Sequence, residues 1–563
     1  MPEHPYGWLS IAPPLVAVVL AIATRRILAS LVAGLAFGAM VTAGGQPVTA
    51  LIDLFETHLW QTAIDAEKLR VFAFSLLLSA MIGVIQVSGG MRGLVELLTP
   101  WARSRRSGQL VTWLLGLLVF FDDYANCLLV GGTMRATSDR LRISREKLAF
   151  LVDSTAAPVA GVAVISTWIA IELEYIREGL LNLDPQLATG LNPFELFIAC
   201  IPYRFYVIQM LLFLPLMAML RRDFGPMLAA ERRAAAGGSP VWASAGRAVD
   251  PYDDGLGLRT MHWTNALVPL GATLAVAVWL IYATGAAVVA QQQPEPAGFA
   301  RVRQAFGNGA SSVALYYGGM AGLAVAAALA RWRAGVAAAQ IVRAAGLGAR
   351  MILPALAILL LAGAMSRMTG NKSPTGQPTE TPYEFQQTRL YTGEFLEHQL
   401  LTASDGATQQ FAVWLPSIVF VLSAVIAFCT GTSYGTMGIL VPMVIPLAAA
   451  TLGATAPADL AASPLFLCAM GNVLAGAIFG DHCSPISDTT ILSSLASGCD
   501  HMAHVNTQLP YALAVAVVAV VFGTVPVGYG VSVWLLLPLE TAALVGVLLA
   551  VGKPVKTAAQ LPR

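Results

Sequence analysis

The sequence predicts an all-α polytopic membrane protein, and three observations lead to that prediction. Of the 563 residues, 56% are hydrophobic and only 12% are charged, whereas soluble domains carry about 25% charged residues. Apolar runs of membrane-spanning length recur along the chain, and the basic residues concentrate in alternate loops. The net charge of +1 says nothing about nucleic acid, but the basic residues are spread over loops and form no patch, so nucleic acid is not an expected partner.

The apolar runs predict about 11 membrane spans. A helical span needs about 20 mostly apolar residues. The predicted spans cover residues 8–23, 27–43, 71–88, 148–171, 194–220, 264–290, 310–330, 351–368, 464–497, 509–528 and 531–550. The first residues lack the basic segment of a signal peptide, so residues 8–23 are expected to stay as the first span.

The loops between these spans differ in their content of Lys and Arg. One alternate set of loops holds 24 of the 33 basic residues, and the opposite set holds eight. Cytoplasmic loops collect Lys and Arg. The protein is therefore expected in the cytoplasmic (inner) membrane, with its N-terminus on the outer side and its C-terminus on the cytoplasmic side.

Residues 109–134 are predicted to form a re-entrant hairpin. Arginines precede and follow this run, so both ends are expected on the cytoplasmic side, and the run is too short for two crossings. Irregular backbone at membrane depth is tolerated only where protein or water surrounds it. The polar middle, F-F-D-D-Y-A-N-C at 120–127, suits the tip of such a hairpin.

A second set of polar strings predicts an inverted repeat. D-Y-A-N at 123–126 aligns with S-Y-G-T at 433–436, and D-S-T-A-A-P at 153–158 resembles D-H-C-S-P at 481–485. Each half then contains three spans, a hairpin, a broken span and a final span.

The predicted units are 1–220 (hairpin about 109–134, broken span about 148–171), a cytoplasmic linker at 221–263, 264–530 (hairpin about 411–447, broken span about 464–497), and an extra span with a tail at 531–563. Residues 369–410 are predicted as an external loop with a short surface helix at 393–400.

The stretch F-G-D-H-C-S-P-I-S-D-T-T at 479–490 places charged and polar groups inside an apolar segment. Pro485 interrupts the helix and frees backbone carbonyls, and transporter ion sites lie at such breaks. Oxygen ligands suit a hard cation such as sodium. An intramembrane Asp costs about 2.5–3.5 kcal/mol, so it needs a functional or structural reason. The predicted ion- or substrate-binding residues are Asp123, Asn126, Asp153, Ser154, Thr155, Thr432, Ser433, Asp481, Ser484, Asp488 and Thr489.

Several assignments keep a structural alternative. The aspartates either bind an ion or accept hydrogen bonds from freed backbone N–H groups. His482 either tunes proton affinity or acts as a neutral donor that fixes the Asp481 carboxylate. Arg204 either counters a carboxylate or snorkels to an interface. The D-H-x-x-H string at 500–504 is expected to be a solvated loop in preference to a metal site. Asp122 is either a functional carboxylate or only an interfacial one, and Glu540 is left without a role.

These strings resemble the NhaC family of sodium/proton antiporters. F-G-D-H-C-S-P-I-S-D-T-T (479–490) is similar to the signature of that family. G-T-S-Y-G-T-M-G-I-L-V-P (431–442), F-F-D-D-Y-A-N (120–126) and L-V-D-S-T-A-A-P (151–158) resemble its other blocks. The resemblance implies the fold of the ion-transporter superfamily, with two inverted repeats and re-entrant hairpins. It leaves the substrate open, since similar sequences include malate/lactate exchangers and amino acid carriers.

The predicted function is secondary active transport without a cofactor or an enzymatic step. A sodium ion and a proton would compete for the same oxygens during alternating access, with Asp481 and Asp153 at the centre. The open alternative is sodium- or proton-coupled transport of a small carboxylate or amino acid. Sodium, protons and the lipid bilayer are the expected partners, and a small organic acid or amino acid and a homodimer stay open. An intramembrane aspartyl protease leaves the inverted repeat unexplained.

Overall fold

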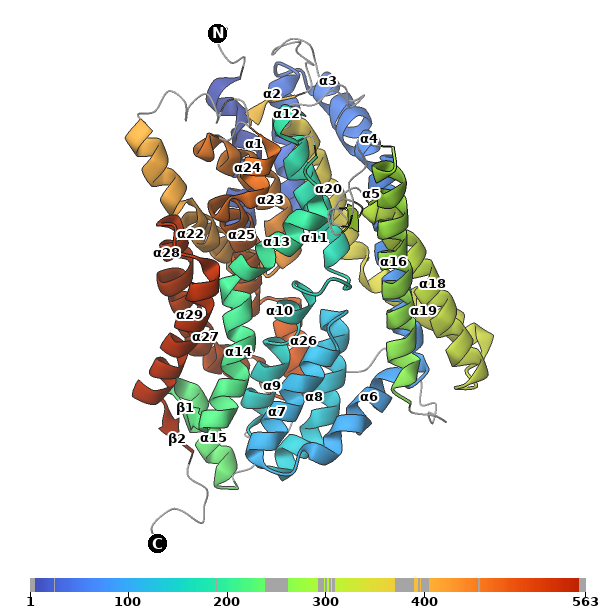
Figure 1. Ribbon diagram of the computed structural model, residues 1–563, viewed down its shortest axis with the longest axis vertical. Coiled ribbons are helices and arrows are strands. Elements are labelled where there is room, and N and C mark those ends of the chain that lie inside the picture. Colours follow the sequence, from blue (N-terminus) through green and yellow to red (C-terminus); the bar gives the residue numbers. More distant parts are fainter. Residues whose placement is uncertain are drawn as a thin grey trace.

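The computed structural model is built almost entirely from helices, in agreement with the predicted fold class (Figure 1). It describes residues 6–24, 26–183, 185–188, 190–237, 262–291, 298, 301–302, 305, 309–369, 389–392, 395, 405–453 and 456–555. Most of the predicted linker at 221–263, most of the predicted loop at 369–410 and all of the predicted helix at 393–400 except residue 395 lie outside these residues.

The first half of the chain consists of helices of very different lengths. They are η1 (Gly7–Ser10), α1 (Ala12–Thr24), α2 (Ile27–Thr42), α3 (Pro47–Ile52), η2 (Asp53–Trp60), α4 (Gln61–Ala63), α5 (Ala66–Val87), α6 (Gly90–Leu98), η3 (Thr99–Trp101), α7 (Arg105–Leu118), α8 (Asp123–Arg140), α9 (Arg145–Asp153), α10 (Ala157–Ala160), α11 (Ile169–Leu181), α12 (Pro185–Ala188), α13 (Pro193–Cys200), η4 (Ile201–Tyr203) and α14 (Phe205–Leu220).

A short strand and a short helix follow before the second half begins. Strand β1 (Arg222–Asp223) pairs antiparallel with β2 (Lys553–Pro554), and α15 (Gly225–Ala235) comes next. The remaining helices are α16 (Thr264–Val289), α18 (Ser311–Trp332), α19 (Ala338–Met351), α20 (Leu353–Thr369), α22 (Asp405–Thr430), α23 (Ser433–Leu452), α24 (Pro457–Ala462), α25 (Pro464–Cys483), α26 (Asp488–Ser497), α27 (His501–Val518), η5 (Ala519–Thr524), α28 (Val525–Gly528) and α29 (Val533–Ala550).

Nine helices within the described ranges are long and apolar enough to cross a membrane, and a bent pair raises the number to 10. The bent pair joins residues 193–203 to α14 at an angle of 51°. Pro202 occupies the single 3-10 turn before the bend, and the Arg204 backbone leaves the helical region. Helices α1 and α2 are apolar but shorter.

Three predicted loops contain helix. Helix α11 continues to Leu181 inside the predicted loop 172–193, α19 occupies most of the predicted loop 331–350, and α27 begins at His501. These segments carry charged or polar residues, which argued for exposed loops. The structure instead buries several of those side chains against partners on other helices, as in α11, where Glu172, Glu174 and Glu178 are all buried.

Two pairs of helices reverse direction at polar turns within the predicted hairpins. Helices α7 and α8 are joined by residues 119–122, and α22 and α23 by residues 431–432. Asp122 caps α8 by accepting a hydrogen bond from Ala125 N (2.7 Å). Thr432 occupies the same position before α23, with Gly435 N donating to its Oγ1 at 3.5 Å. Gly431 has φ +66°, a conformation that glycine adopts without strain.

Two further helices are interrupted near the predicted Asp and Pro residues. Helix α9 ends at Asp153 and α11 begins at Ile169, with only the short α10 between them. Helix α25 ends at Cys483 and α26 begins at Asp488, with Pro485 in the interruption. The packing around these breaks is reciprocal: α8 packs on α26, and α23 packs on α11. Outside them, α2 packs on α20, and α18 packs on α5.

Candidate ion-binding site

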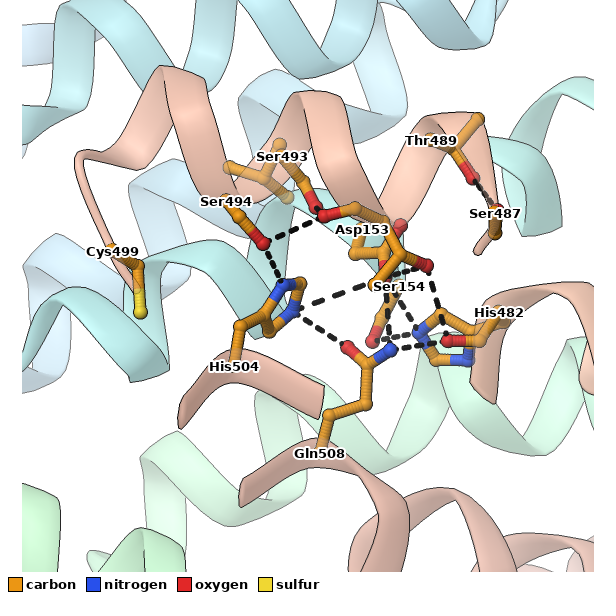
Figure 2. Close-up of polar contacts among 12 residues, drawn as sticks. Asp153, Ser154, His482, Ser487, Thr489, Ser493, Ser494, Cys499, His504 and Gln508 are labelled. Atoms are coloured by element: carbon orange, nitrogen blue, oxygen red, sulfur yellow. Dashed lines mark hydrogen bonds and ion pairs between the residues drawn. The ribbon is translucent and has the colours of Figure 1, made fainter. Parts of the chain in front are cut away.

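Asp153 is buried at the end of α9, beside the second interrupted helix and α27. Its Oδ2 accepts hydrogen bonds from Thr490 Oγ1 (3.1 Å) and Gln508 Nε2 (2.9 Å). The Nε2 atoms of His482 and His504 lie 3.9 Å and 3.8 Å from that oxygen. Figure 2 shows the side chains of His482 on α25 and of His504 and Gln508 on α27 converging on the aspartate. The end of the first broken helix is therefore held by groups from the second half of the chain.

Gln508 joins three of the groups around this aspartate. Its Nε2 donates to Asp153 and also to the main-chain carbonyl of His482. Its Oε1 lies 2.8 Å from His504 Nε2, and His504 Nδ1 lies 2.8 Å from Ser494 Oγ (Figure 2). One amide side chain on α27 thus connects the ends of α9 and α25.

Asp481 is buried in the last turn of α25 and is tied to the second hairpin. Its Oδ2 accepts hydrogen bonds from the Ser433 hydroxyl (2.7 Å) and the Ser433 backbone N–H (3.1 Å). Ser433 is the first residue of α23, so the exposed N–H groups of a helix N-terminus face the carboxylate. The hairpin tip and the helix break are held together by this contact.

Four predicted aspartates, Asp123, Asp153, Asp481 and Asp488, lie close enough for their charges to repel one another. We call this group the aspartate row. Asp153 interacts with Asp481 and Asp488, Asp481 interacts with Asp488, and Asp488 interacts with Asp123. The Tyr124 hydroxyl at the first hairpin tip donates to Asp488. Among the described residues, no Lys or Arg forms an ion pair with any of the four. A row of buried carboxylates without a basic partner attracts cations.

Three oxygens near this row have no donor. Within the described part of the chain, Asp153 Oδ1, Asp481 Oδ1 and Asn126 Oδ1 are buried without a hydrogen-bond partner. Asn126 is held close to the first break because its Nδ2 donates to the carbonyl oxygens of Gly116 and Thr155, both at 2.8 Å. Unsatisfied buried acceptors are rare and require an explanation, and an ion that occupies the site is one.

Several predicted hydroxyl ligands are engaged with backbone. Thr155 Oγ1 donates to Leu151 O (2.9 Å), and Ser484 Oγ donates to Phe428 O (2.7 Å). The Thr489 and Ser487 hydroxyls lie 3.0 Å apart. Thr432 caps α23, so Thr155 and Thr432 serve the backbone of their own helices. Ser484 contacts the backbone of another helix, α22, and Thr489 contacts a side-chain hydroxyl. Ser154 contacts the His482 side chain instead, and Ser433 donates to Asp481.

His482 does not hydrogen-bond to Asp481, its neighbour in sequence. Its Nδ1 lies 2.8 Å from the Tyr206 hydroxyl, and its Nε2 lies 3.0 Å from Ser154 Oγ. The expectation that His482 fixes the Asp481 carboxylate is therefore wrong, because the ring points across to the first broken helix. Sequence reasoning also missed Gln508, Thr490 and Tyr206, whose positions depend on the packing of α14, α26 and α27.

The D-H-x-x-H string at 500–504 is a helix start and not a solvated loop. Asp500 caps α27 by accepting from Ala503 N (2.8 Å), and His504 is fully buried beside Asp153. His501 Nε2 lies 2.6 Å from the Pro485 carbonyl oxygen. In the described ranges, no three His, Cys, Asp or Glu side chains converge as a metal site.

This cap gives a testable prediction for the stability of the region. Replacing Asp500 by alanine is expected to cost about 1 kcal/mol of stability, because it removes a helix N-cap. Asp500→Asn keeps a capping oxygen and is expected to unfold at nearly the wild-type temperature. Thermal unfolding of the two purified variants in detergent compares them directly. Equal losses in both would show that the charge of Asp500 matters and the cap does not.

Two polar residues left open by the sequence are also buried. Arg204 does not snorkel to an interface: it forms an ion pair with Glu172 (2.8 Å) and donates to the Gly161 carbonyl. Glu540 on α29 accepts a hydrogen bond from Gln209 Nε2 (2.9 Å) on α14. Arg204 is thus paired with a glutamate, and among the described residues it forms no ion pair with the four aspartates.

Interrupted helices that bring buried carboxylates and helix ends together define a class of membrane protein, the secondary transporters. The chain belongs to the Na+/H+ antiporter family, whose pattern it matches over residues 159–372 and 399–526. This confirms the family resemblance drawn from the sequence motifs. The protein is thus a multi-pass membrane protein and a secondary antiporter.

Three relatives are similar in sequence to this chain. An uncharacterized protein of Haemophilus influenzae is 32% identical over 526 residues, covering 93% of this chain and 91% of that protein. An uncharacterized Na(+)/H(+) antiporter of the same organism is 41% identical over 106 residues, 18% of this chain and 20% of that one. The malate-2H(+)/Na(+)-lactate antiporter of Bacillus subtilis is 33% identical over 156 residues, 24% and 30% of the two chains.

Proposed function

We propose that this protein exchanges sodium for protons at the site formed by Asp153 and Asp481. One observation carries the proposal: each carboxylate is buried at the end of an interrupted helix, with one oxygen held by donors and the other without a partner. The held oxygen fixes the position of the group. The free oxygen is the place for a cation or a proton.

Exchange follows from competition for these oxygens. A buried carboxylate without a counter-ion is energetically costly. It is therefore occupied either by a proton or by a metal cation. Sodium binding favours the ionised form and expels the proton, so the two ions use the same site in alternation. Carboxylate and amide oxygens such as Asn126 Oδ1 are hard ligands that suit sodium.

The surroundings of the site favour a cation over an organic anion as the exchanged ion. A carboxylate substrate needs a basic group or helix N-termini free to receive it. Arg204 is fully buried, and Glu172 already pairs with it. The N–H of Ser433 at the second hairpin tip is taken by Asp481. Coupled transport of a small carboxylate is named for the Bacillus relative and is the second candidate here.

We infer that alternating access uses two inverted halves, residues 1–220 and 264–530, linked by 221–263 and followed by an extra unit at 531–563. The reciprocal packing supports this arrangement, because the second helix of each hairpin contacts the second part of the other half's broken helix. The matching caps at Asp122 and Thr432 support it as well. The hairpins and broken helices would move together against the other spans.

The proposed location is the cytoplasmic membrane, with the N-terminus outside and the C-terminus inside. Support comes from the end of the molecule that holds α15 and β2 (Figure 1). There Arg105 pairs with Glu231 (2.5 Å), Lys147 with Asp223, and Arg233 with Glu146. Basic residues collect on the cytoplasmic side of membrane proteins.

The exchange proposal is tested with purified protein in liposomes that contain a pH-sensitive dye. The lumen is acidified, and sodium is then added outside without any organic solute. We expect immediate dye recovery, because sodium entry drives protons out. Recovery that needs an added carboxylic or amino acid would instead support the coupled carrier. Protein-free liposomes give the background leak.

A further inference from the structure

A small cavity lies at the first hairpin tip, outside the aspartate row used above. Its volume is about 20 Å³, and it is lined by residues of α5, of the turn into α8 and of the end of α19. A single water or a bare monovalent cation needs about 10–15 Å³ of such volume. The polar lining consists of Ser79 and Gln86 from α5 with Asp122 and Tyr124 from the hairpin.

The α5 side chains share one helix face. Ser79, Ile82 and Gln86 are spaced by three and four residues, which places them in line along the helix. Gly348 of α19 lies directly against the Ser79 backbone, and a Cβ there would overlap the Ser79 carbonyl oxygen. The close approach of α5 and α19 therefore closes the cavity on one side, and the hairpin tip closes it on the other.

One of the oxygens that line this cavity lacks a protein donor. Gln86 Oε1 is buried without a hydrogen-bond partner among the described residues, and the Ser79 side chain lines the same space. Leaving a buried amide oxygen unsatisfied costs about 1–3 kcal/mol. A native structure retains such a group when an ion or water supplies the missing partner.

We propose that this cavity binds a second sodium ion through Asp122, Gln86 Oε1 and the Ser79 hydroxyl. The inference rests on the proposed sodium exchange. A carboxylate with two neutral oxygens matches the ligand preference of a hard cation. Asp122 is also an electrostatic neighbour of Asp123, which interacts with Asp488. The cavity thus adjoins the far end of the carboxylate row, where a second cation offsets the repulsion between its members.

The test is equilibrium binding of radioactive sodium to the purified full-length protein. We expect about two ions per wild-type chain and about one in Gln86→Met and in Asp122→Asn. Methionine preserves side-chain length without an acceptor, and asparagine preserves the cap on α8. The exchange rate is expected to depend on sodium concentration in a sigmoidal way in the wild type and in a hyperbolic way in both variants. Elution as a single monodisperse peak shows that each variant is folded.

Matched controls separate the cavity from its helices. Ser75→Ala on α5 removes a hydroxyl that bonds back to Val71 O, and Asp139→Asn lies at the far end of α8. Both are expected to bind two ions. Wild-type protein that exchanges sodium but binds one ion, unaffected by Gln86→Met, would overturn the cavity proposal and assign the space to water. Wild-type protein that neither binds nor exchanges sodium would overturn the proposed function as well.

Discussion

Replacing Asp481 by asparagine is expected to abolish sodium-driven dye recovery in the liposome assay. Asparagine is nearly isosteric and can still accept the hydrogen bonds of Ser433, so the second hairpin stays attached to α25. What it loses is the negative charge and the ability to exchange a proton. An interaction with a charged group is worth about 1.5–3 kcal/mol, which corresponds to roughly a 10- to 150-fold loss of sodium affinity.

The control for this variant is an aspartate of similar chemistry outside the site. Asp459 lies in the first turn of α24 and is expected to tolerate replacement by asparagine with full exchange. Ser433→Ala is a second useful comparison, because it removes one donor but keeps the Asp481 charge. It is expected to weaken exchange less than Asp481→Asn. Wild-type recovery rates in Asp481→Asn would rule out this carboxylate as the shared site.

The two helix breaks could be predicted because their causes are local. Pro485 and the polar string around it interrupt an apolar run within a few residues, and the repeat of this pattern at 153–158 directed attention to Asp153. The polar tips of the hairpins are also local features. Sequence alone was therefore sufficient to nominate Asp153, Asp481 and Ser433, whose side chains the structure places at the breaks.

The partners of these residues could not be predicted, because they depend on how distant helices pack. Gln508 reaches Asp153 only because α27 begins at His501 and lies beside both broken helices. No spacing rule connects residue 153 to residue 508. The one local signal was Asp500, a good capping residue before an apolar run. Because Asp500 was assigned to a loop, the two histidines and the glutamine of the helix that it caps were not considered as site residues.

The same limit explains the misassigned segment after residue 171. Glutamates within a membrane span are energetically costly when they are unpaired. The run that contains Glu172, Glu174 and Glu178 was therefore predicted to be a solvent-exposed loop. The structure pairs Glu172 with Arg204, and Glu178 with Lys68. The basic partners lie more than 30 residues away in the sequence. The ion pairs that stabilise the buried glutamates therefore cannot be predicted from the local sequence.

Replacing Glu172 by leucine is accordingly expected to destabilise the protein severely. Both partners of the Glu172–Arg204 pair are fully buried. Removing one member of such a pair leaves an uncompensated charge and costs about 3–5 kcal/mol. This is a large share of the roughly 5–15 kcal/mol that stabilises a folded domain. The unfolding temperature and the lifetime of the purified variant in detergent are measured, and both are expected to fall below the wild-type values. Asp139→Leu breaks a partly exposed ion pair and is expected to cost at most about 1 kcal/mol.

The double variant Glu172→Leu with Arg204→Met separates charge burial from packing. It removes both charges and keeps apolar volume at the bend before α14, so much of the lost stability is expected to return. Full recovery is not expected, because Arg204 also donates to the Gly161 carbonyl, and an unsatisfied carbonyl costs about 1–3 kcal/mol. A double variant no more stable than Glu172→Leu would mean that the glutamate acts through its shape and contacts, and that Arg204 finds another partner when it is gone.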